Sequence, residues 1–121
     1  MKYRVILDKI YEDINIKFTI VVPVYNQEKL ILQNINSIIF NTLGEYEIII
    51  INDYSNDKTL ELLNNFFVNY EPIYSNFKRI RIIDTNWPLF ETKCDNIGFK
   101  LSKAKFVLEI QADMQMLIKG Y

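Results

Sequence analysis

The sequence predicts an α/β domain with an open, mostly parallel sheet and helices on both of its faces. Four short runs rich in Ile and Val recur along the chain, and their apolar character is continuous rather than alternating overall, despite single polar residues, as expected of strands that are covered on both faces. Helix-like stretches separate these runs, and this alternation implies right-handed βαβ units. The predicted strands are residues 18–22, 47–51, 80–83 and 106–110.

Three helices are expected between the predicted strands. Residues 27–39 and 57–70 place Leu, Ile or Phe at helical spacing, and Asp57 is typical of a helix cap or a first-turn residue. Residues 91–102 form the third helix, with Cys94 on its apolar face. Gly98 lies inside this helix, where glycine is less favourable than alanine by about 1 kcal/mol.

We place the predicted domain at residues 18–121. Residues 1–17 form an N-terminal extension whose mixture of apolar and charged residues fits either a short amphipathic helix or an added strand. Residues 70–78 contain Pro, Ser and Asn and are expected to form a loop. The sequence stops soon after the fourth predicted strand, so we expect a truncated domain.

Composition argues against several classes of protein. The 121 residues suffice for one hydrophobic core, and 14 basic against 15 acidic residues do not create the positive field that nucleic acid or an anionic membrane attracts. A single cysteine excludes an internal disulfide, and together with the lack of a signal-peptide pattern it favours a cytoplasmic location. Histidine is absent, so any chemistry depends on carboxylates, amides, hydroxyls or lysines.

Polar side chains follow every predicted strand. Asp53 comes after the second strand and Asp113 after the fourth, and amide side chains surround both. Ligands of open α/β sheets bind beyond the carboxyl ends of the strands. Carboxylate and amide oxygens suit hydrogen bonding to a base or a ribose, and they also suit ligation of a divalent cation.

Three segments resemble the motifs of one enzyme family, in the same order and spacing. They are TIVVPVYNQE at residues 19–28, INDYSNDKT at 51–59, and DNIG at 95–98 leading into AKFVLEIQAD at 104–113. The first two are similar to the first-strand and second-strand motifs of family 2 glycosyltransferases, and the third is similar to the approach to that family's D-x-D metal motif. The resemblance implies the nucleotide-sugar-binding half of a Rossmann-like GT-A fold.

The resemblance also implies roles for individual residues. Pro23, Tyr25 and Asn26 would shape the turn under the nucleotide, with Glu28 nearby, and Asp53 would accept a hydrogen bond from the base.

Further contacts are implied near the end of the chain. Asp95, Asn96 and Gln111 would contact the substrate. Asp113 would hold Mn²⁺ or Mg²⁺, which neutralises charge on the leaving nucleotide.

Two residues depart from the family pattern. Gln111 replaces the first aspartate of D-x-D, which exchanges a charged metal ligand for a neutral amide and predicts weaker metal binding. Tyr54 stands where glycine is common. An inverting member of the family also needs an acceptor-activating carboxylate from a later segment. No catalytic residue is therefore assigned, and we expect this piece to bind the donor without completing the reaction.

Simpler structural interpretations remain open for several of these residues. Asp53 fits an ordinary turn aspartate, although its matched neighbours favour nucleotide binding. Asp113 fits a solvated acid at a strand end, and Glu28 fits a first-turn glutamate that complements the dipole of the first helix.

The predicted function is that of a glycosyltransferase domain that binds a nucleoside-diphosphate sugar, preferably a uridine one, for transfer to an unidentified glycan, protein or lipid. The alternative is a non-catalytic nucleotide-binding or assembly module. The chain lacks the acidic cluster that follows the first strand of a receiver domain. It also lacks the G-x-G-x-x-G turn of a dinucleotide-binding domain. The exposed sheet edge of a truncated domain predicts a homodimer, which a monomeric peak in light scattering would contradict.

Overall fold

The computed structural model describes residues 3–12, 15–85, 90–102, 104 and 106–110, with the side chains of residues 90–95 left out. The described part contains five strands and three helices in the order ββαβαβαβ. They are β1 (Tyr3–Ile10), β2 (Phe18–Val24), α1 (Ile31–Asn41), β3 (Tyr46–Asn52), α2 (Thr59–Val68), β4 (Phe77–Thr85), α3 (Phe90–Leu101) and β5 (Phe106–Glu109).

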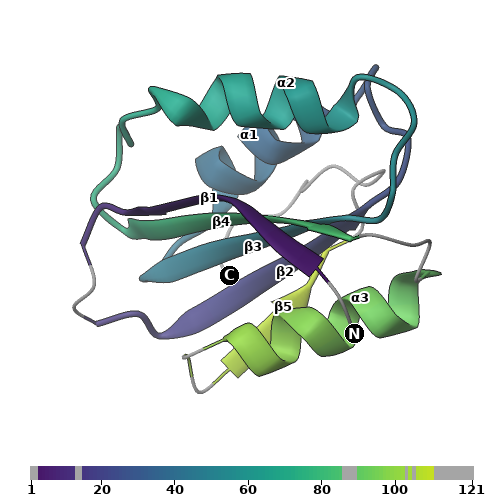
Figure 1. The fold of residues 1–121 in the computed structure, drawn as a ribbon. Coiled ribbons are helices and arrows are strands. Elements are labelled where there is room, and N and C mark those ends of the chain that lie inside the picture. Colours follow the sequence, from purple (N-terminus) through teal and green to yellow (C-terminus); the bar gives the residue numbers. More distant parts are fainter. Residues whose placement is uncertain (1–2, 13–14, 86–89, 103, 105, 111–121) are drawn as a thin grey trace.

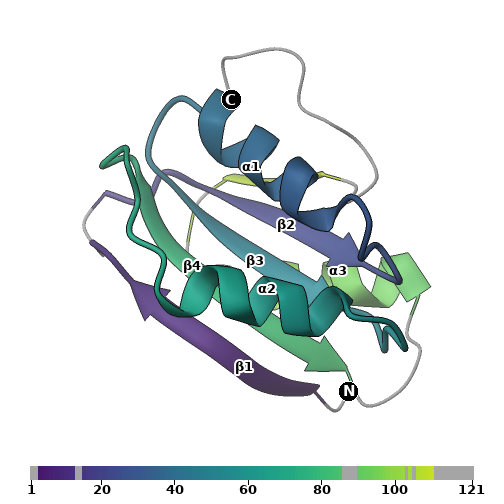
Figure 2. The same ribbon diagram turned by 90° about the horizontal axis from the view of Figure 1, so that it is seen from above.

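The strands form one sheet in the order β1-β4-β3-β2-β5. Strands β2 to β5 are parallel, and β1 pairs with β4 in the antiparallel direction. Helices α1 and α2 cover one face and α3 covers the other (Figure 1). Seen from above, the three central strands point toward the same edge (Figure 2). The predicted fold class is therefore confirmed.

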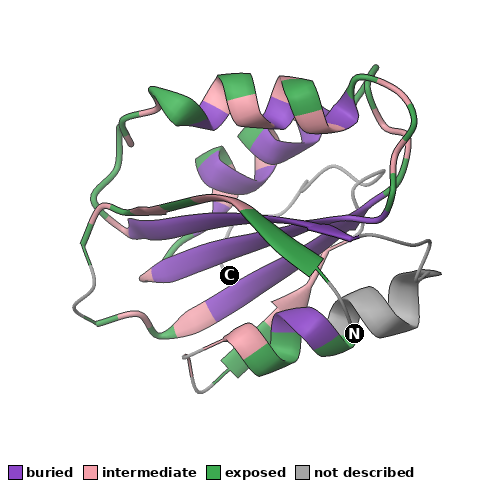
Figure 3. Ribbon diagram, viewed as in Figure 1, coloured by how far each residue is buried: buried purple, intermediate pink, exposed green. Residues whose placement is uncertain are grey.

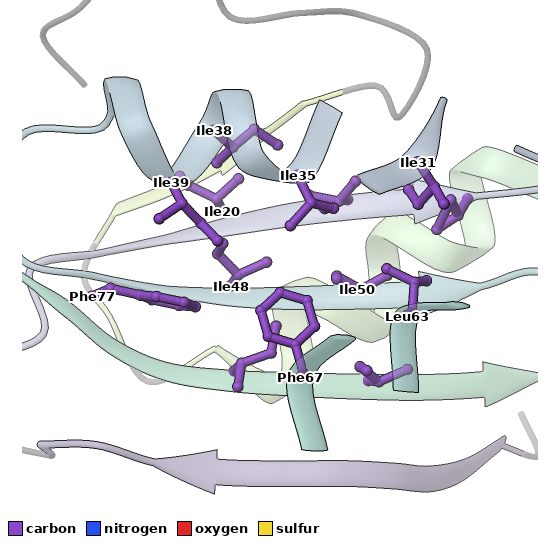
Figure 4. Close-up of a cluster of buried hydrophobic side chains, with 14 of the residues drawn as sticks. Ile20, Ile31, Ile35, Ile38, Ile39, Ile48, Ile50, Leu63, Phe67 and Phe77 are labelled. Atoms are coloured by element: carbon purple, nitrogen blue, oxygen red, sulfur yellow. The ribbon is translucent and has the colours of Figure 1, made fainter. Parts of the chain in front are cut away.

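The larger core lies between the sheet and helices α1 and α2. All seven residues of β3 are buried, which explains why its Ile run does not alternate with polar residues (Figure 3). Apolar side chains of both helices point toward the strands (Figure 4). Prominent members of this core are Ile20, Ile31, Ile35, Ile38, Ile48, Ile50, Leu63, Phe67 and Phe77.

The smaller core, under α3, depends on a close approach of the helix to β2. Its buried members are Val21, Ile49, Ile51, Ile83 and Ile97. A Cβ atom added to Gly98 would lie 2.5 Å from Cγ1 of Val21, so only glycine fits this contact without a shift. The glycine that weakens α3 as a helix thus allows its packing on the sheet.

A buried ion pair completes the α3 side of the sheet. Arg81 of β4 donates to Oε1 of Glu47 at 2.8 Å and to the Leu101 carbonyl at 2.9 Å, and Glu47 is fully buried. Thr19 donates to Oε2 of Glu47 at 2.7 Å and accepts from Ser102 at 2.7 Å. These bonds tie the end of α3 to three strands.

Several element boundaries differ from the sequence prediction. Strand β4 begins at Phe77 rather than at residue 80, so the last two residues of the predicted loop, 77 and 78, belong to the strand. Helix α1 begins at Ile31 rather than at residue 27, because residues 28–30 form a turn and no side chain caps the helix. Helix α2 spans Thr59–Val68, two residues shorter at each end than predicted.

The N-terminal segment adopts the second of its two predicted forms, an added strand at the edge of the sheet. Its apolar residues Ile6 and Leu7 pack against the larger core, while Val5 is exposed. In the described part of the chain, no helix has the length and apolar character that a membrane span requires.

Candidate functional site

The site predicted from the sequence lies where β2, β3 and β4 end. Val24 pairs with Asn52, and Asn52 pairs with Asp84, so these three strands end at the same level. The loop of residues 25–30 follows β2 and the loop of residues 53–58 follows β3. Polar groups from both loops therefore gather at the carboxyl edge of the sheet, the usual ligand position in open α/β sheets.

Hydrogen bonds join the two loops to each other. The Asn26 N–H donates to Oγ of Ser55 at 3.0 Å, and the Asn56 N–H donates to Oδ1 of Asn26 at 2.9 Å. The Gln27 N–H donates to Oγ1 of Thr59 at 2.8 Å. Because side chains of one loop accept hydrogen bonds from backbone N–H groups of the other, the two loops form one structural unit.

Two residues in these loops adopt left-handed backbone conformations. Asn26 has φ 47° and Tyr54 has φ 59°. Asparagine tolerates this region, whereas for most L-residues it costs about 1–2 kcal/mol. The turn at Tyr54 therefore explains why glycine is common at this position in the family that the sequence resembles.

Asp53 lies directly after β3, beside the end of β4. Only 7% of its surface is exposed, its N–H donates to the Val24 carbonyl at 2.7 Å, and its Oδ1 accepts from Thr85 at 3.3 Å. A carboxylate has about four acceptor positions. The carboxylate of Asp53 is thus an acceptor positioned at the carboxyl edge of the sheet.

Glu28 and Asp57 hold the two loops together at the start of α2. Oε2 of Glu28 accepts from the Lys58 N–H at 3.2 Å, and Oδ2 of Asp57 accepts from the Glu28 N–H at 3.3 Å. Glu28 precedes α1 and lies outside its first turn, so it complements the amino end of α2 rather than the dipole of its own helix.

Asp57 accepts from both the N–H and the hydroxyl of Thr59, at 2.9 and 2.5 Å. Desolvation raises the pKa of the Asp57 carboxyl, but the hydrogen bonds from Thr59 and Glu28 outweigh it and hold the pKa below its usual value. The carboxylate thus stabilises the turn into α2. The prediction of Asp57 as the N-cap or a first-turn residue is wrong by one position, because the N-cap is Lys58.

The remaining predicted site residues are spread over three elements. Pro23 is buried in β2, Tyr25 is 54% exposed, and Asn96 is exposed on α3. Asp95 lies in α3, but its side chain is outside the description.

Both predicted residues around the metal, Gln111 and Asp113, lie outside the described residues. Among the described side chains, no group of three acids, cysteines or histidines gathers into a metal site.

Four residues that build this edge were not assigned to the site from the sequence: Asn52, Ser55 and Asp84 were noted only as polar residues that follow strands, and Arg4 was missed. Asn52 donates to Oδ1 of Asp84 at 2.8 Å and accepts from Ser55 at 2.6 Å, and Arg4 donates to Asp84 from β1. Polar residues at the ends of buried strands are a signal for Asn52 and Asp84. Nothing in the sequence connects them to Arg4.

Hollows in the described surface lie toward the opposite end of the sheet. One of about 410 Å³ and another of about 370 Å³ share Phe40 and Tyr74 among their lining residues, which precede β3 and β4. Neither includes a residue from the two loops at the carboxyl edge. The candidate site is therefore defined by the polar groups at the carboxyl edge and not by these hollows.

An open α/β sheet whose strands end in cross-linked polar loops is typical of nucleotide-binding domains. Residues 19–119 match the family described as glycosyl transferase family 2, and the chain belongs to this family. The resemblance found in the sequence motifs is thereby confirmed.

Curated relatives support the same family. The chain is 30% identical to a poly(ribitol-phosphate) beta-glucosyltransferase of Bacillus spizizenii, over 80% of this chain and 15% of that protein. It is 37% identical to an uncharacterized glycosyltransferase of Haemophilus influenzae, over 78% of this chain and 27% of that protein. The chain thus spans well under a third of the length of these relatives.

A solved structure shows the same fold. The chain aligns with S. aureus TarS 1–349 in complex with UDP, with a TM-score of 0.66 and 25% identity. The alignment covers 81% of this chain and 28% of that one. The similar structure is thus a complex with a uridine nucleotide.

Proposed function

We propose that this chain forms the donor half of a glycosyltransferase and binds a uridine diphosphate sugar at the carboxyl edge of its sheet. The observation that carries the proposal is the position of Asp53, which directly follows β3 and begins one of the two cross-linked loops. The similarity to a UDP-bound structure supports the choice of nucleotide.

Asp53 is the residue that selects the base in this proposal. Uracil presents an N–H donor between two carbonyl acceptors, and a carboxylate is an acceptor that matches this donor. Thr85 orients Asp53 from the next strand. An amide keeps a single acceptor oxygen, for which the Thr85 hydroxyl competes, and its NH₂ group then faces the uracil N–H, which disfavours the base.

A divalent cation, Mn²⁺ or Mg²⁺, would be held by Asp113, with Gln111 as a neutral neighbour. When bound, it would neutralise charge on the diphosphate leaving group. The acceptor would be a glycan, protein or lipid bound by other parts of the enzyme, because this chain spans only a part of its relatives.

Calorimetric titration with UDP, with and without Mn²⁺, tests the proposal. Asp53→Asn keeps the shape of the side chain and is expected to weaken UDP binding by about tenfold or more, since a mismatched donor costs about 1–3 kcal/mol. Glu71→Gln removes one exposed acidic charge from the loop after α2 and is expected to leave binding unchanged.

Absence of UDP binding by the unmodified chain would refute the proposal. Equal binding by the unmodified chain and Asp53→Asn would remove Asp53 from the site.

A further inference from the structure

A continuous series of hydrogen bonds crosses the carboxyl end of the sheet from β1 to the loop after β2. Arg4 donates from Nε and Nη2 to Oδ2 of Asp84, at 3.1 and 2.8 Å, and Asn52 donates to Oδ1 of Asp84 at 2.8 Å. Ser55 donates to Oδ1 of Asn52 at 2.6 Å and accepts from the Asn26 N–H at 3.0 Å. We call these five residues the strand-end chain.

The direction of every bond in the strand-end chain follows from the carboxylate of Asp84, which Arg4 pairs with and holds in place. A carboxylate only accepts, so Asn52 must turn its NH₂ group toward Asp84 and its carbonyl toward Ser55. Ser55 must then donate its single hydrogen to Asn52, which leaves its lone pairs for the Asn26 N–H. The arrangement at Asn26 is therefore coupled to Asp84, two strands away.

The middle of the strand-end chain is buried, whereas its start at Arg4 is exposed. Asn52 is 1% exposed and Asp84 is 8% exposed, so a broken bond there leaves a buried polar group without a partner. The Arg4 side chain is 64% exposed. A substitution at Arg4 therefore perturbs the strand-end chain without opening the hydrophobic core.

We propose that Arg4 is a positioning residue of the nucleotide site. It acts through Asp84, Asn52 and Ser55 to hold the loop after β2 against the loop after β3. Arg4 precedes residues 19–119, the segment that matches the family, so the site depends on a strand outside that segment. The consequence for nucleotide binding rests on the proposed function, whereas the coupling to Asn26 does not.

The same two strands provide a matched control. Arg79, near the start of β4, donates to both carboxylate oxygens of Asp8 in β1, at 2.9 and 2.7 Å. As in the first pair, one partner is more exposed, with 37% of the Asp8 side chain and 9% of the Arg79 side chain accessible. Asp8→Ala therefore removes an equivalent β1–β4 ion pair far from the two loops.

The experiment compares Arg4→Ala, Arg4→Lys and Asp8→Ala in the full chain, by amide hydrogen exchange without ligand and by titration with UDP. Arg4→Ala is expected to speed exchange of the Asn26 amide about tenfold and to weaken UDP binding about tenfold relative to Asp8→Ala, a coupling of ordinary size for a polar network. Arg4→Lys should fall in between, because an ammonium keeps the charge but loses the planar fork.

Equal exchange of the Asn26 amide in Arg4→Ala and Asp8→Ala would overturn the inference, because both variants would then only loosen β1. If the unmodified chain does not bind UDP, the proposed function fails, and the exchange comparison still decides the role of Arg4. Binding of UDP that is equal in all variants would confine Arg4 to a structural role.

Discussion

The two ends of the parallel sheet are held by different kinds of interaction. At the amino end, the first residues of β2, β3 and β4 stack their rings, with centroids 6.0 Å apart for Phe18 and Tyr46 and 5.1 Å apart for Tyr46 and Phe77. Glu47, which directly follows Tyr46 in β3, forms a buried ion pair with Arg81 of β4. Asn76 also donates to the Thr42 and Gly44 carbonyls at this end. At the carboxyl end, hydrogen bonds between the two loops take the place of ring stacking. The amino end is thus held mainly by packing and the carboxyl end, where we propose that the nucleotide binds, by polar cross-links.

The largest expected effect comes from breaking the buried ion pair at the amino end. Glu47→Ala leaves Arg81 buried without its charged partner and is expected to destabilise the fold by about 3–5 kcal/mol, measured by urea unfolding. The double variant Glu47→Leu with Arg81→Met removes both charges and should lose much less. A double variant as unstable as Glu47→Ala would show that the loss comes from packing rather than from the unpaired charge.

Gly98→Ala tests the contact between α3 and the middle of β2. The added methyl group would meet Val21 at 2.5 Å, and the cost of overpacking, about 1–3 kcal/mol, exceeds the gain in helix propensity of about 1 kcal/mol. We expect a lower unfolding midpoint. Combining Gly98→Ala with Val21→Ala should lower the free energy of unfolding by less than the sum of the two single changes. If the two changes are strictly additive, the added methyl group does not clash with Val21.

At the carboxyl end, Tyr54 tests backbone strain. Tyr54→Gly is expected to stabilise the fold by up to about 1 kcal/mol, while Tyr54→Val should destabilise it by about 1 kcal/mol, because a β-branched residue is least tolerated at positive φ. Tyr25 is similarly exposed but has no positive φ, so Tyr25→Gly should not stabilise. Stabilisation by both glycine variants would remove the strain argument.

The smallest expected effect concerns pH at the same end. The pKa of Asp57 is lowered in the folded chain, so its stabilising contribution is present above its usual pKa of 3.8 and is lost as the pH falls through the lower folded value. The thermal midpoint should therefore fall more steeply below about pH 4 in the unmodified chain than in Asp57→Asn. Parallel pH profiles for the two proteins would contradict this.

The sheet was predictable because its central strands are buried on both faces and read as continuous Ile and Val runs. Strand β1 was not assigned from its sequence, since an edge strand with charges on it has the same pattern as a short amphipathic helix. The start of α1 was misplaced because Leu30, at its N-cap, provides no side-chain cap that a sequence pattern would reveal.

The site was predictable only in part. Asn26 and Asp53 were found through motif resemblance, and the structure places both at the carboxyl edge. The link from Arg4 to Asp84 spans 80 residues, and no local pattern reveals a contact of that separation. The strand-end chain could therefore be identified only from the structure.

The most direct measurement is the change in amide chemical shifts on addition of UDP to the unmodified chain. Our account predicts the largest changes in residues 25–28 and 53–58, at the carboxyl ends of β2 and β3, with little change around Phe40 and Tyr74. Changes confined to the hollows at Phe40 and Tyr74, with none at Asp53, would place nucleotide binding at the opposite end of the sheet and contradict the central claim.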